Sequence, residues 1–216
     1  MKMKKYVLGA MLLLAGAACF ASGGSDREDD DFRDHSADNA SKSGLGFAVS
    51  AAVEFGGDSA DSVLLCDSSG QNCSYHSVST GQGLTFSVGG HYKFASLPLD
   101  IMATVGYKYV TTPASNANIY IGRVVPALQF SYWFTDSWWM GVGPVWHLNN
   151  AFHAARNVTG LDSQKYDPAL GVNLEAGWKF VALTYTNINY NYLDANDGEK
   201  KKLNASNFGV MLIGRF

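Results

Sequence analysis

Charged and imidazole side chains alternate with apolar residues in several stretches between Gly44 and Phe216. A period of two places one set of side chains on one face of a strand and the other set on the opposite face. Acids and bases that share a buried face must pair with one another or meet water, because an isolated buried ion is very costly. The predicted chemistry is therefore ion pairing within an enclosed interior. The residues concerned are Glu54, His91, Lys93, Lys108, Arg123, His147, Glu175, Lys179 and Arg215.

The strands that must position these side chains are short and regularly spaced. The least regular is the seventh, because Tyr185 fits one parity and Ile188 and Tyr190 fit the other, which predicts a bulge or a mixed face. A tight turn is expected near Val181. The expected strands span residues 45–55, 84–94, 101–109, 119–134, 138–148, 170–180, a segment between 183 and 192, and 208–216.

Apolar residues face outward and polar residues inward in this alternation, which is the reverse of a soluble barrel. Outward aromatic residues also gather near two rims, where amphipathic rings favour a membrane interface. The predicted rim aromatics are Phe47, Tyr92, Phe94, Tyr132, Phe134, Trp138, Trp178, Phe180 and Phe216 on one side, and Phe55, Tyr107, Tyr109, Trp146, Tyr190, Tyr192 and Phe208 on the other.

The links between the expected strands alternate in length. Long polar links are expected at Gly57–Ser79, Asn149–Tyr166 and Asp194–Asn204, with a shorter one at Thr112–Asn118. Short links are expected at Ser96–Asp100, at Thr135–Ser137 and near Val181. The sequence therefore predicts an all-β fold: an eight-stranded antiparallel transmembrane β-barrel with short periplasmic turns and longer extracellular loops.

The last strand closes such a barrel and has a recognisable pattern. Phe208, Val210, Leu212 and Phe216 share one face, which is the face that meets lipid in a barrel. An alternating last strand that ends in Phe resembles the C-terminal signal that the assembly machinery of bacterial outer-membrane proteins reads.

Three features together resemble the small eight-stranded outer-membrane proteins typified by OmpX and the transmembrane domain of OmpA, with OmpW a close alternative. They are the closing Arg215–Phe216, the turn Tyr132–Trp138 and the paired aromatic rims. The resemblance implies a multi-pass barrel in the outer membrane of a Gram-negative-type bacterium, reached by secretion through the inner membrane. The implied partners are outer-membrane lipids and lipopolysaccharide, the barrel-assembly machinery and periplasmic chaperones, and no nucleic acid.

The N-terminal region predicts export. Residues 1–21 combine three early lysines, an apolar run and small residues, which is typical of a signal peptide. Lipidation of Cys19 is the alternative, although a lipobox prefers Leu where this chain has Gly16. Residues 22–43 are acidic and are expected to form a flexible periplasmic segment ahead of the barrel at 44–216. The Asp run lacks the spacing of an EF-hand calcium loop.

Two cysteines remain after signal cleavage. Cys66 and Cys73 flank a polar, turn-rich stretch, and an even pair in an exported protein predicts a disulfide. Two thiols with only His76 nearby fall short of the four ligands of a structural zinc site. We therefore expect a disulfide rather than a metal centre.

An enzyme is the alternative class of protein, because lipid A deacylases and acyltransferases also use eight-stranded barrels. The deacylase pattern resembles His-x-Ser with a nearby Glu, for base-activated attack of Ser on an ester. Here Ser77 directly follows His76, and His147 has no Ser two residues on. An acyltransferase would need His, Asp and Ser gathered at one rim, which only loop folding could provide. We therefore expect no catalytic residues and no cofactor.

The interior and the loops leave three functions open. The interior is expected to be a salt-bridged plug, since eight strands enclose only enough space for side chains, with a narrow conduit as the alternative. The loops, including the run Lys200–Lys202, could bind host surfaces, lipopolysaccharide or other partners. An OmpW-like passage for small hydrophobic compounds is the third possibility, since Trp133 and Ile213 are apolar and expected to face inward.

Overall fold

The structure, a computed structural model, describes residues 43–66, 73–113, 118–154, 164–193 and 198–216. The predicted signal peptide, Cys19 and the acidic segment lie outside the described residues. No helix in the described ranges is long and apolar enough to cross a membrane. The strands are β1 (Gly44–Gly56), β2 (Ser59–Cys66), β3 (Cys73–Ser79), β4 (Gly83–Lys93), β5 (Leu99–Pro113), β6 (Asn118–Trp133), β7 (Trp138–Ala154), β8 (Gln164–Lys165), β9 (Ala169–Trp178), β10 (Val181–Asn187), β11 (Asn189–Leu193), β12 (Lys200–Asn204) and β13 (Asn207–Arg215).

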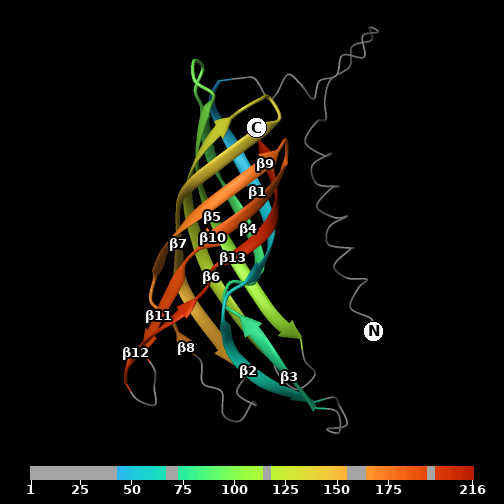
Figure 1. Ribbon diagram of the computed structural model, residues 1–216, viewed down its shortest axis with the longest axis vertical. Coiled ribbons are helices and arrows are strands. Elements are labelled where there is room, and N and C mark those ends of the chain that lie inside the picture. The colour runs from blue at the N-terminus through green and yellow to red at the C-terminus, as the bar shows by residue number, and fades with distance from the viewer. Residues whose placement is uncertain (1–42, 67–72, 114–117, 155–163, 194–197) are drawn as a thin grey trace. The chain divides into compact units, whose positions relative to one another are not determined.

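The main sheet of the described chain closes on itself. Its strand order is β6-β5-β4-β1-β13-β10-β9-β7-β8, and β6 also pairs with β7. Eight of these strands form the ring, while the two-residue β8 pairs only with the far end of β7 (Figure 1). Neighbouring strands of the ring run antiparallel. The prediction of an eight-stranded antiparallel barrel is confirmed.

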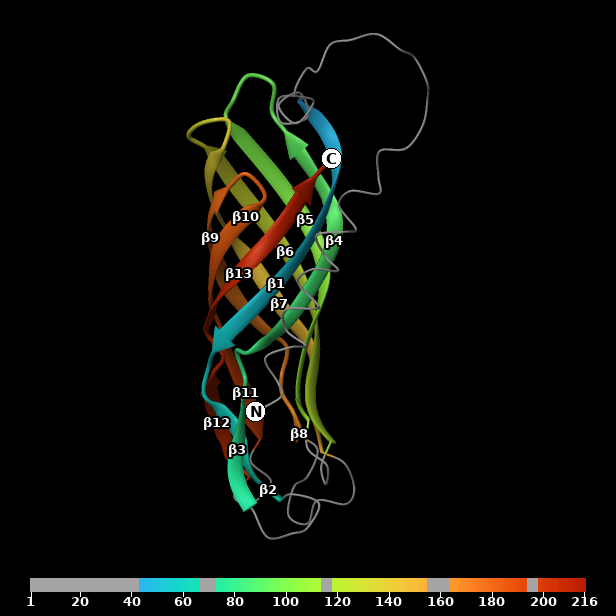
Figure 2. The same ribbon diagram turned by 90° about the vertical axis from the view of Figure 1, so that its right-hand side faces the viewer.

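The last strand completes the ring. Strand β13 pairs with β1 on one side and with β10 on the other. The amide of Phe47 donates to the carbonyl of Phe216 at 2.8 Å, and the amide of Phe216 donates back to the carbonyl of Phe47 at 2.8 Å. Figure 2 shows β13 beside β1, with the C-terminus at the end where β1 begins.

The barrel has a polar interior and an apolar exterior. Trp138 on the outer surface is 58% exposed, whereas Lys108 and Arg123 inside the barrel are each 1% exposed. Water would favour the reverse arrangement, and lipid favours this one, because the apolar side chains then meet hydrocarbon. The closed ring also leaves no strand edge unpaired in the membrane. The alternation of residue types along each strand thus produces a membrane-spanning barrel.

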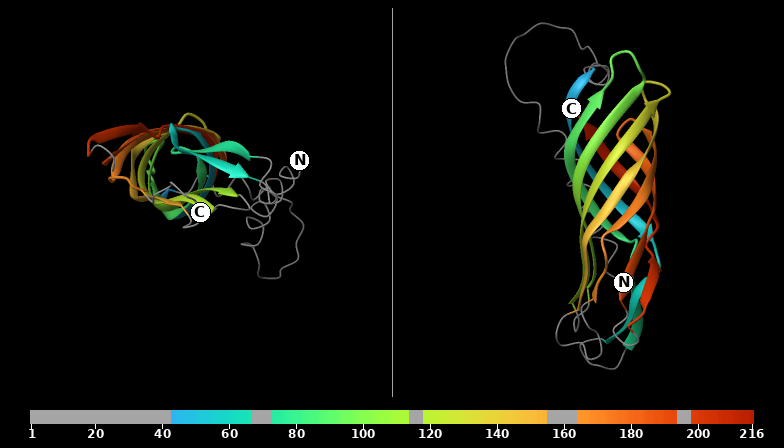
Figure 3. Two further views of the ribbon diagram at one scale, coloured as in Figure 1. Left: turned by 90° about the horizontal axis from the view of Figure 1, so that it is seen from below. Right: turned by 90° about the vertical axis from the view of Figure 1, so that its left-hand side faces the viewer.

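The two ends of the barrel differ. Short links at residues 94–98, 134–137 and 179–180 and both barrel termini lie at one end, called the turn end here. At the other end, called the loop end, β2 and β3 form one separate hairpin, and β11 and β12 form another (Figure 3). The long links expected at Gly57–Ser79 and Asp194–Asn204 are therefore partly strand, and β7 continues to Ala154 instead of ending at Leu148.

The seventh strand keeps a single parity, so the predicted change of face is wrong. Thr184, Thr186, Ile188 and Tyr190 are all buried, and the residues between them are less buried. The inward residues become apolar because the chain passes from the barrel (β10) into the loop-end hairpin (β11). Tyr190, expected at a lipid-facing rim, is fully buried.

The irregularity lies instead between β6 and β7. Their register shifts between Gly122 and Val124, so that two residues of β7 oppose one residue of β6. Asn149, one of the two, has φ 53°, a left-handed conformation that Asn tolerates better than most residues. The bulge lies opposite Arg123 and carries β7 on into the loop end.

Candidate functional site: the barrel interior and its loop end

The structure places most of the predicted interior residues inside the barrel. Lys93 is partly buried, and the side chain of Arg215 is 9% exposed. The interior residues form two groups, one toward each end of the barrel, and Glu175 lies between the two groups. The fully buried members of the predicted set are Glu54, His91, Lys108, Arg123, His147 and Glu175.

Lys179 is the exception and corrects the prediction. It lies in the link between β9 and β10, where it is exposed and has φ 51°. Its ammonium lies 5.2 Å from the ring centroid of Trp178. The period of two placed it inside because the strand was expected to run to Phe180, but the turn begins directly after Trp178.

The group nearer the loop end is centred on an ion pair. Nζ of Lys108 on β5 lies 3.1 Å from Oε1 of Glu54 on β1. The hydroxyl of Thr85, on the intervening strand β4, donates to the other carboxylate oxygen of Glu54. Both charges thus have partners inside the barrel, which is the condition for tolerating buried charges.

Arg123 connects this group to the base of the loop-end hairpins. Its Nη1 donates to the carbonyl of Thr80 at 2.6 Å and its Nη2 to the carbonyl of Gln82 at 2.9 Å. The Thr80 hydroxyl in turn is within hydrogen-bond distance of the carbonyls of Asp58 (3.0 Å) and Asn204 (2.9 Å). One guanidinium therefore anchors the point where the β2–β3 hairpin, the β11–β12 hairpin and the barrel meet.

Tyr190 connects the ion pairs to an apolar core that lies farther toward the loop end. Its hydroxyl lies 2.5 Å from Nδ1 of His147, and its ring centroid lies 5.9 Å from the guanidinium carbon of Arg123. Burial raises the pKa of the Tyr190 phenol, which lies in β11 beyond the barrel sheet, so the hydroxyl stays protonated and can donate to His147. The surrounding loop-end core comprises Val78, Val110, Ile121, Phe152, Tyr166, Ala169, Ile188, Tyr190 and Ala205, with Tyr192 and Leu203 packed against it.

The group at the turn end is built on Asp100, which two cationic or imidazole side chains share. Oδ2 of Asp100 lies 3.3 Å from Nδ1 of His91 and 3.5 Å from Nε of Arg215. The guanidinium of Arg215 also stacks over Trp139, at 4.2 Å from its ring centroid, and lies 5.2 Å from that of Trp133. Cation–π contacts of this kind strengthen when water is excluded.

The two tryptophans fill the barrel at this end. Their ring centroids are 6.0 Å apart, and Nε1 of Trp139 donates to the carbonyl of Lys179 at 3.3 Å. Gly177 pairs with Trp139 across β7 and β9, and a Cβ at Gly177 would collide with the indole ring. Glycine at this position therefore makes room for Trp139 to lie across the interior.

A cavity of about 70 Å³ separates the two groups, enough for a few water molecules. The amide of Asn173 donates to Oε1 of Glu175 at 2.8 Å, and the Thr186 hydroxyl donates to Oδ1 of Asn173 at 3.0 Å. Within the described chain, Oε2 of Glu175 and the side-chain amide of Gln129 have no hydrogen-bond partner. Water in the cavity would satisfy these atoms, because buried polar groups are rarely left unpaired.

Two of these interior residues were not predicted from the sequence. Asp100 lies at the inward parity of β5, directly before Ile101, where the strand was expected to begin. A strand that starts one residue earlier includes it, and β5 in fact starts at Leu99. Thr80 lies in a turn and is marked by no pattern, because its importance comes from the carbonyl that Arg123 reaches across the barrel.

The other predicted sites are placed as follows. Phe208, Val210 and Phe216 lie on the outer surface, and Leu212 is half-buried. Cys66 and Cys73 are backbone partners at the end of the β2–β3 ladder, and the disulfide between them stays a prediction. In the described part of the chain, no group of three His, Cys, Asp or Glu side chains could hold a metal ion. The loop residues Asp67 and Ser68 lie outside the described residues.

Fold and interior together define a small transmembrane β-barrel whose polar interior is filled from both ends. No protein-family model matches the sequence, and no curated protein matches it. Six chains of solved structures are similar, among them the following two. The crystal structure of Ail, the attachment invasion locus protein of Yersinia pestis, in complex with the heparin analogue sucrose octasulfate has 8% identity and a TM-score of 0.39, covering 80% of this chain and 99% of that one. The crystal structure of Neisserial surface protein A has 11% identity and a TM-score of 0.39, covering 79% and 97%. At this similarity neither bears on the function of this chain, and its description as a barrel rests on strand pairing.

Proposed function

We propose that this chain is an outer-membrane surface protein whose barrel is closed to solutes and whose loop-end hairpins bind partners outside the cell. The turn end then faces the periplasm and the loop end faces outward. The barrel is an anchor in this proposal, with no catalytic residues and no cofactor. Partners in its biogenesis are the barrel-assembly machinery and periplasmic chaperones, with Phe208, Val210, Leu212 and Phe216 as the assembly signal.

The observation that carries the proposal is the filling of the interior at both levels. At the turn end the guanidinium of Arg215 stacks on the ring of Trp139. At the loop end the ring of Tyr190, a member of the apolar core, lies against the guanidinium of Arg123. The cavity between these layers has room for a few water molecules and not for a sugar or an amino acid. A solute would have to displace buried, paired charges, which is costly.

The projecting hairpins are the surfaces left for recognition. Strands β2 and β3, like β11 and β12, pair only with each other among the described strands and extend from the loop end (Figure 1). The anchoring of both by Arg123 and Thr80 holds them in fixed positions. Rigid presentation lowers the entropy lost on binding, which favours a recognition role over that of passive linkers.

Single-channel recording of the refolded mature protein in planar bilayers tests the closed barrel, with heat-modifiable gel mobility as the check of folding. We expect a mobility shift with no steady conductance. Stable openings that are lost in E54Q or R123M would contradict the proposal and favour a narrow channel for ions or small hydrophobic solutes.

Replacement of residues 61–77 by a short turn tests the recognition role, since Asp58 and Thr80 stay in place. Bacteria displaying the shortened protein should lose adhesion to surfaces coated with matrix proteins or glycans, while the barrel keeps its heat-modifiable mobility. Unchanged adhesion to every surface that the parent protein binds would rule out the β2–β3 hairpin as the recognition element.

A further inference from the structure

The β11–β12 hairpin has two chemically different faces. Tyr190 is fully buried on the inner face, and Tyr192 and Leu203 pack beside it against the loop-end core. The opposite face points away from the barrel and is polar and basic. We call it the lysine face; it comprises Asn189, Asn191, Leu193, Lys200, Lys202 and Asn204.

Strand pairing brings the donors of the lysine face close together. Lys202 pairs with Asn191, and Lys200 pairs with Leu193. Directly paired side chains on one face have Cβ atoms about 5 Å apart, and residues two apart on a strand are about 7 Å apart. Two flexible ammonium groups and an amide can therefore reach one anion of the size of a phosphate.

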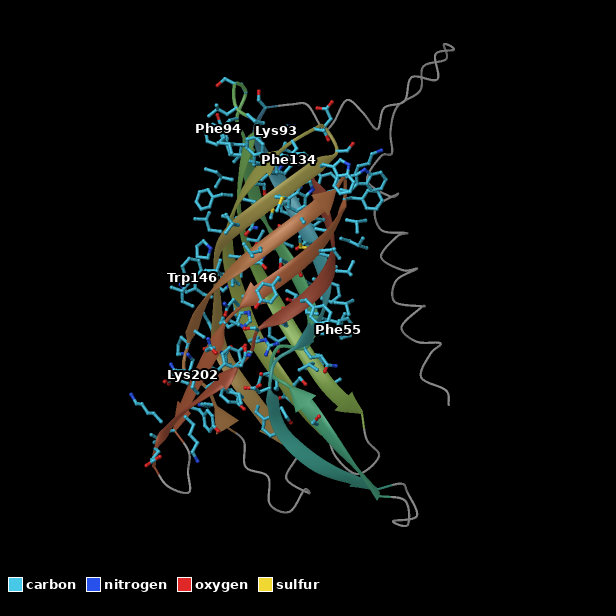
Figure 4. The ribbon with its side chains drawn as sticks, in the orientation of Figure 1. Phe55, Lys93, Phe94, Phe134, Trp146 and Lys202 are labelled. Atoms are coloured by element: carbon cyan, nitrogen blue, oxygen red, sulfur yellow. The ribbon has the colours of Figure 1, made fainter. Side chains whose placement is uncertain are left out.

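The lysine face continues the lipid-facing side of the barrel. Leu183 and Tyr185 on β10 are exposed to the outside, and the same parity leads through Asn187 to Asn189 and Asn191. On β13 the outward Phe208 leads in the same way to Lys202. Figure 4 shows Trp146 on the outer wall of the barrel and Lys202 farther toward the loop end on the same flank. The lysines thus lie beyond the apolar belt on the loop-end side. With that belt in the hydrocarbon of a membrane, this is the side on which the lipid headgroups begin.

We propose that the lysine face binds the phosphate groups of membrane lipids in the leaflet at the loop end. The inference rests on the proposed function, because it needs the apolar belt to lie in the outer membrane. Each lysine near an anionic membrane surface strengthens binding about fivefold, which corresponds to about 1 kcal/mol of attraction. The amide of Asn191 adds a directional donor between the two charges.

Lipid is the partner favoured over a soluble polyanion for two reasons. The lysine face points sideways along the membrane, so a molecule seated there would be surrounded by lipid headgroups. Leu193 is 62% exposed beside Lys200, and an exposed leucine in a basic patch suits a partner that carries both phosphate and hydrocarbon. Lipid bound to the lysine face would hold the hairpin at the membrane surface.

Native mass spectrometry of the full mature barrel in detergent micelles tests the inference, with diphosphorylated lipid A and its dephosphorylated form as probes. The parent protein should retain the phosphorylated form preferentially. K200Q/K202Q should weaken retention about thirtyfold, because two charges of about 1 kcal/mol each are lost. K200R/K202R should keep it. The matched control is K179Q, which removes an exposed lysine at the turn end and should leave retention unchanged.

Three results would overturn the inference: equal retention of both lipids, retention that K200Q/K202Q does not weaken, or equal weakening by K179Q. A fourth arm adds inorganic polyphosphate in solution, and binding as tight as that of lipid A would mean a site for soluble polyanions instead. Failure of the proposed function is separate. A conducting barrel would remove the closed-barrel proposal while leaving lipid retention by the lysine face intact.

Discussion

The two ends of the barrel are closed by the same kind of contact but with different partners. At each end an arginine guanidinium lies against an aromatic ring: Arg123 against Tyr190 at the loop end, and Arg215 against Trp139 at the turn end. Arg123 gives its hydrogen bonds to two backbone carbonyls, whereas Arg215 approaches a carboxylate, that of Asp100.

Because of this difference, Arg123 anchors the loop-end hairpins, whereas Arg215 only fills the turn end of the barrel. Backbone carbonyls belong to the chain path, so Arg123 determines where the turn after β3 lies and, through Thr80, where β12 meets β13. Asp100 at the turn end keeps His91 as a second partner, so the loss of Arg215 leaves it paired. We therefore expect changes at the loop end to cost more stability and to reach the hairpins, and changes at the turn end to stay local.

The largest effect is expected for Lys108→Met, which leaves Glu54 buried without its cation. Breaking a buried ion pair on one side costs about 3–5 kcal/mol of unfolding free energy. Denaturant titration of the barrel in lipid vesicles, followed by tryptophan fluorescence, measures it. The double variant E54Q/K108M should recover part of the loss, since it removes the orphaned charge. A double variant as unstable as the sum of its two single variants would show that the pair is not coupled.

Arg123→Met should come next and should distinguish the two ends. Two buried carbonyls lose their donor, at about 1–2 kcal/mol each, so the unfolding free energy falls by about 2–4 kcal/mol. Arg215→Met keeps its stem over Trp139 and should cost about 1 kcal/mol less.

Limited proteolysis of the folded variants sharpens this contrast. The β2–β3 and β11–β12 hairpins should be cut faster in R123M than in the parent, because their common anchor is gone. In R215M the cutting rate should match the parent. Equal cutting in both variants would contradict the role of Arg123 as the common anchor of the two hairpins.

Tyr190→Phe should have a smaller effect, because it removes one hydroxyl and keeps the ring against Arg123. The loss is that of a buried hydrogen bond to His147, about 1–2 kcal/mol. Tyr185→Phe, on the lipid-facing side of β10, is the matched control and should stay within about 0.5 kcal/mol of the parent. The same denaturant titration compares them; equal losses would mean that the His147 contact contributes nothing.

The smallest effect concerns the two non-glycine residues with positive φ, one at each end. Lys179→Gly at the turn end should raise the unfolding free energy by up to about 1 kcal/mol, because glycine adopts φ 51° without steric cost. Asn149→Gly in the loop-end bulge should be close to neutral, since Asn tolerates φ 53°. A gain for N149G larger than that for K179G would reverse the comparison.

The sequence determined the barrel because lipid imposes a simple rule on every strand. Alternation with a period of two separates residues that must meet hydrocarbon from residues that must not, and it acts locally, along ten or so residues at a time. Hence the strand number, the inside-out sense and the burial of Glu54, Lys108, Arg123 and His147 could be read from the chain.

The same rule explains where the prediction failed. The alternation rule applies only to the part of a strand inside the membrane. It therefore predicts Tyr190 at the lipid, whereas in the structure this side chain belongs to an apolar core beyond the barrel. It also says nothing of turn boundaries, so Lys179 was expected inside although the chain had already turned.

Only the tertiary structure decided which partners meet. Glu54 and Lys108 lie on strands that are two apart in the ring, and Arg123 reaches Thr80, which is 43 residues away in the chain. Such contacts depend on the stagger of the closed ring and on the bulge opposite Arg123, and both are set by all eight strands together. A single strand determines the face that a side chain occupies, and closure of the barrel determines its neighbour.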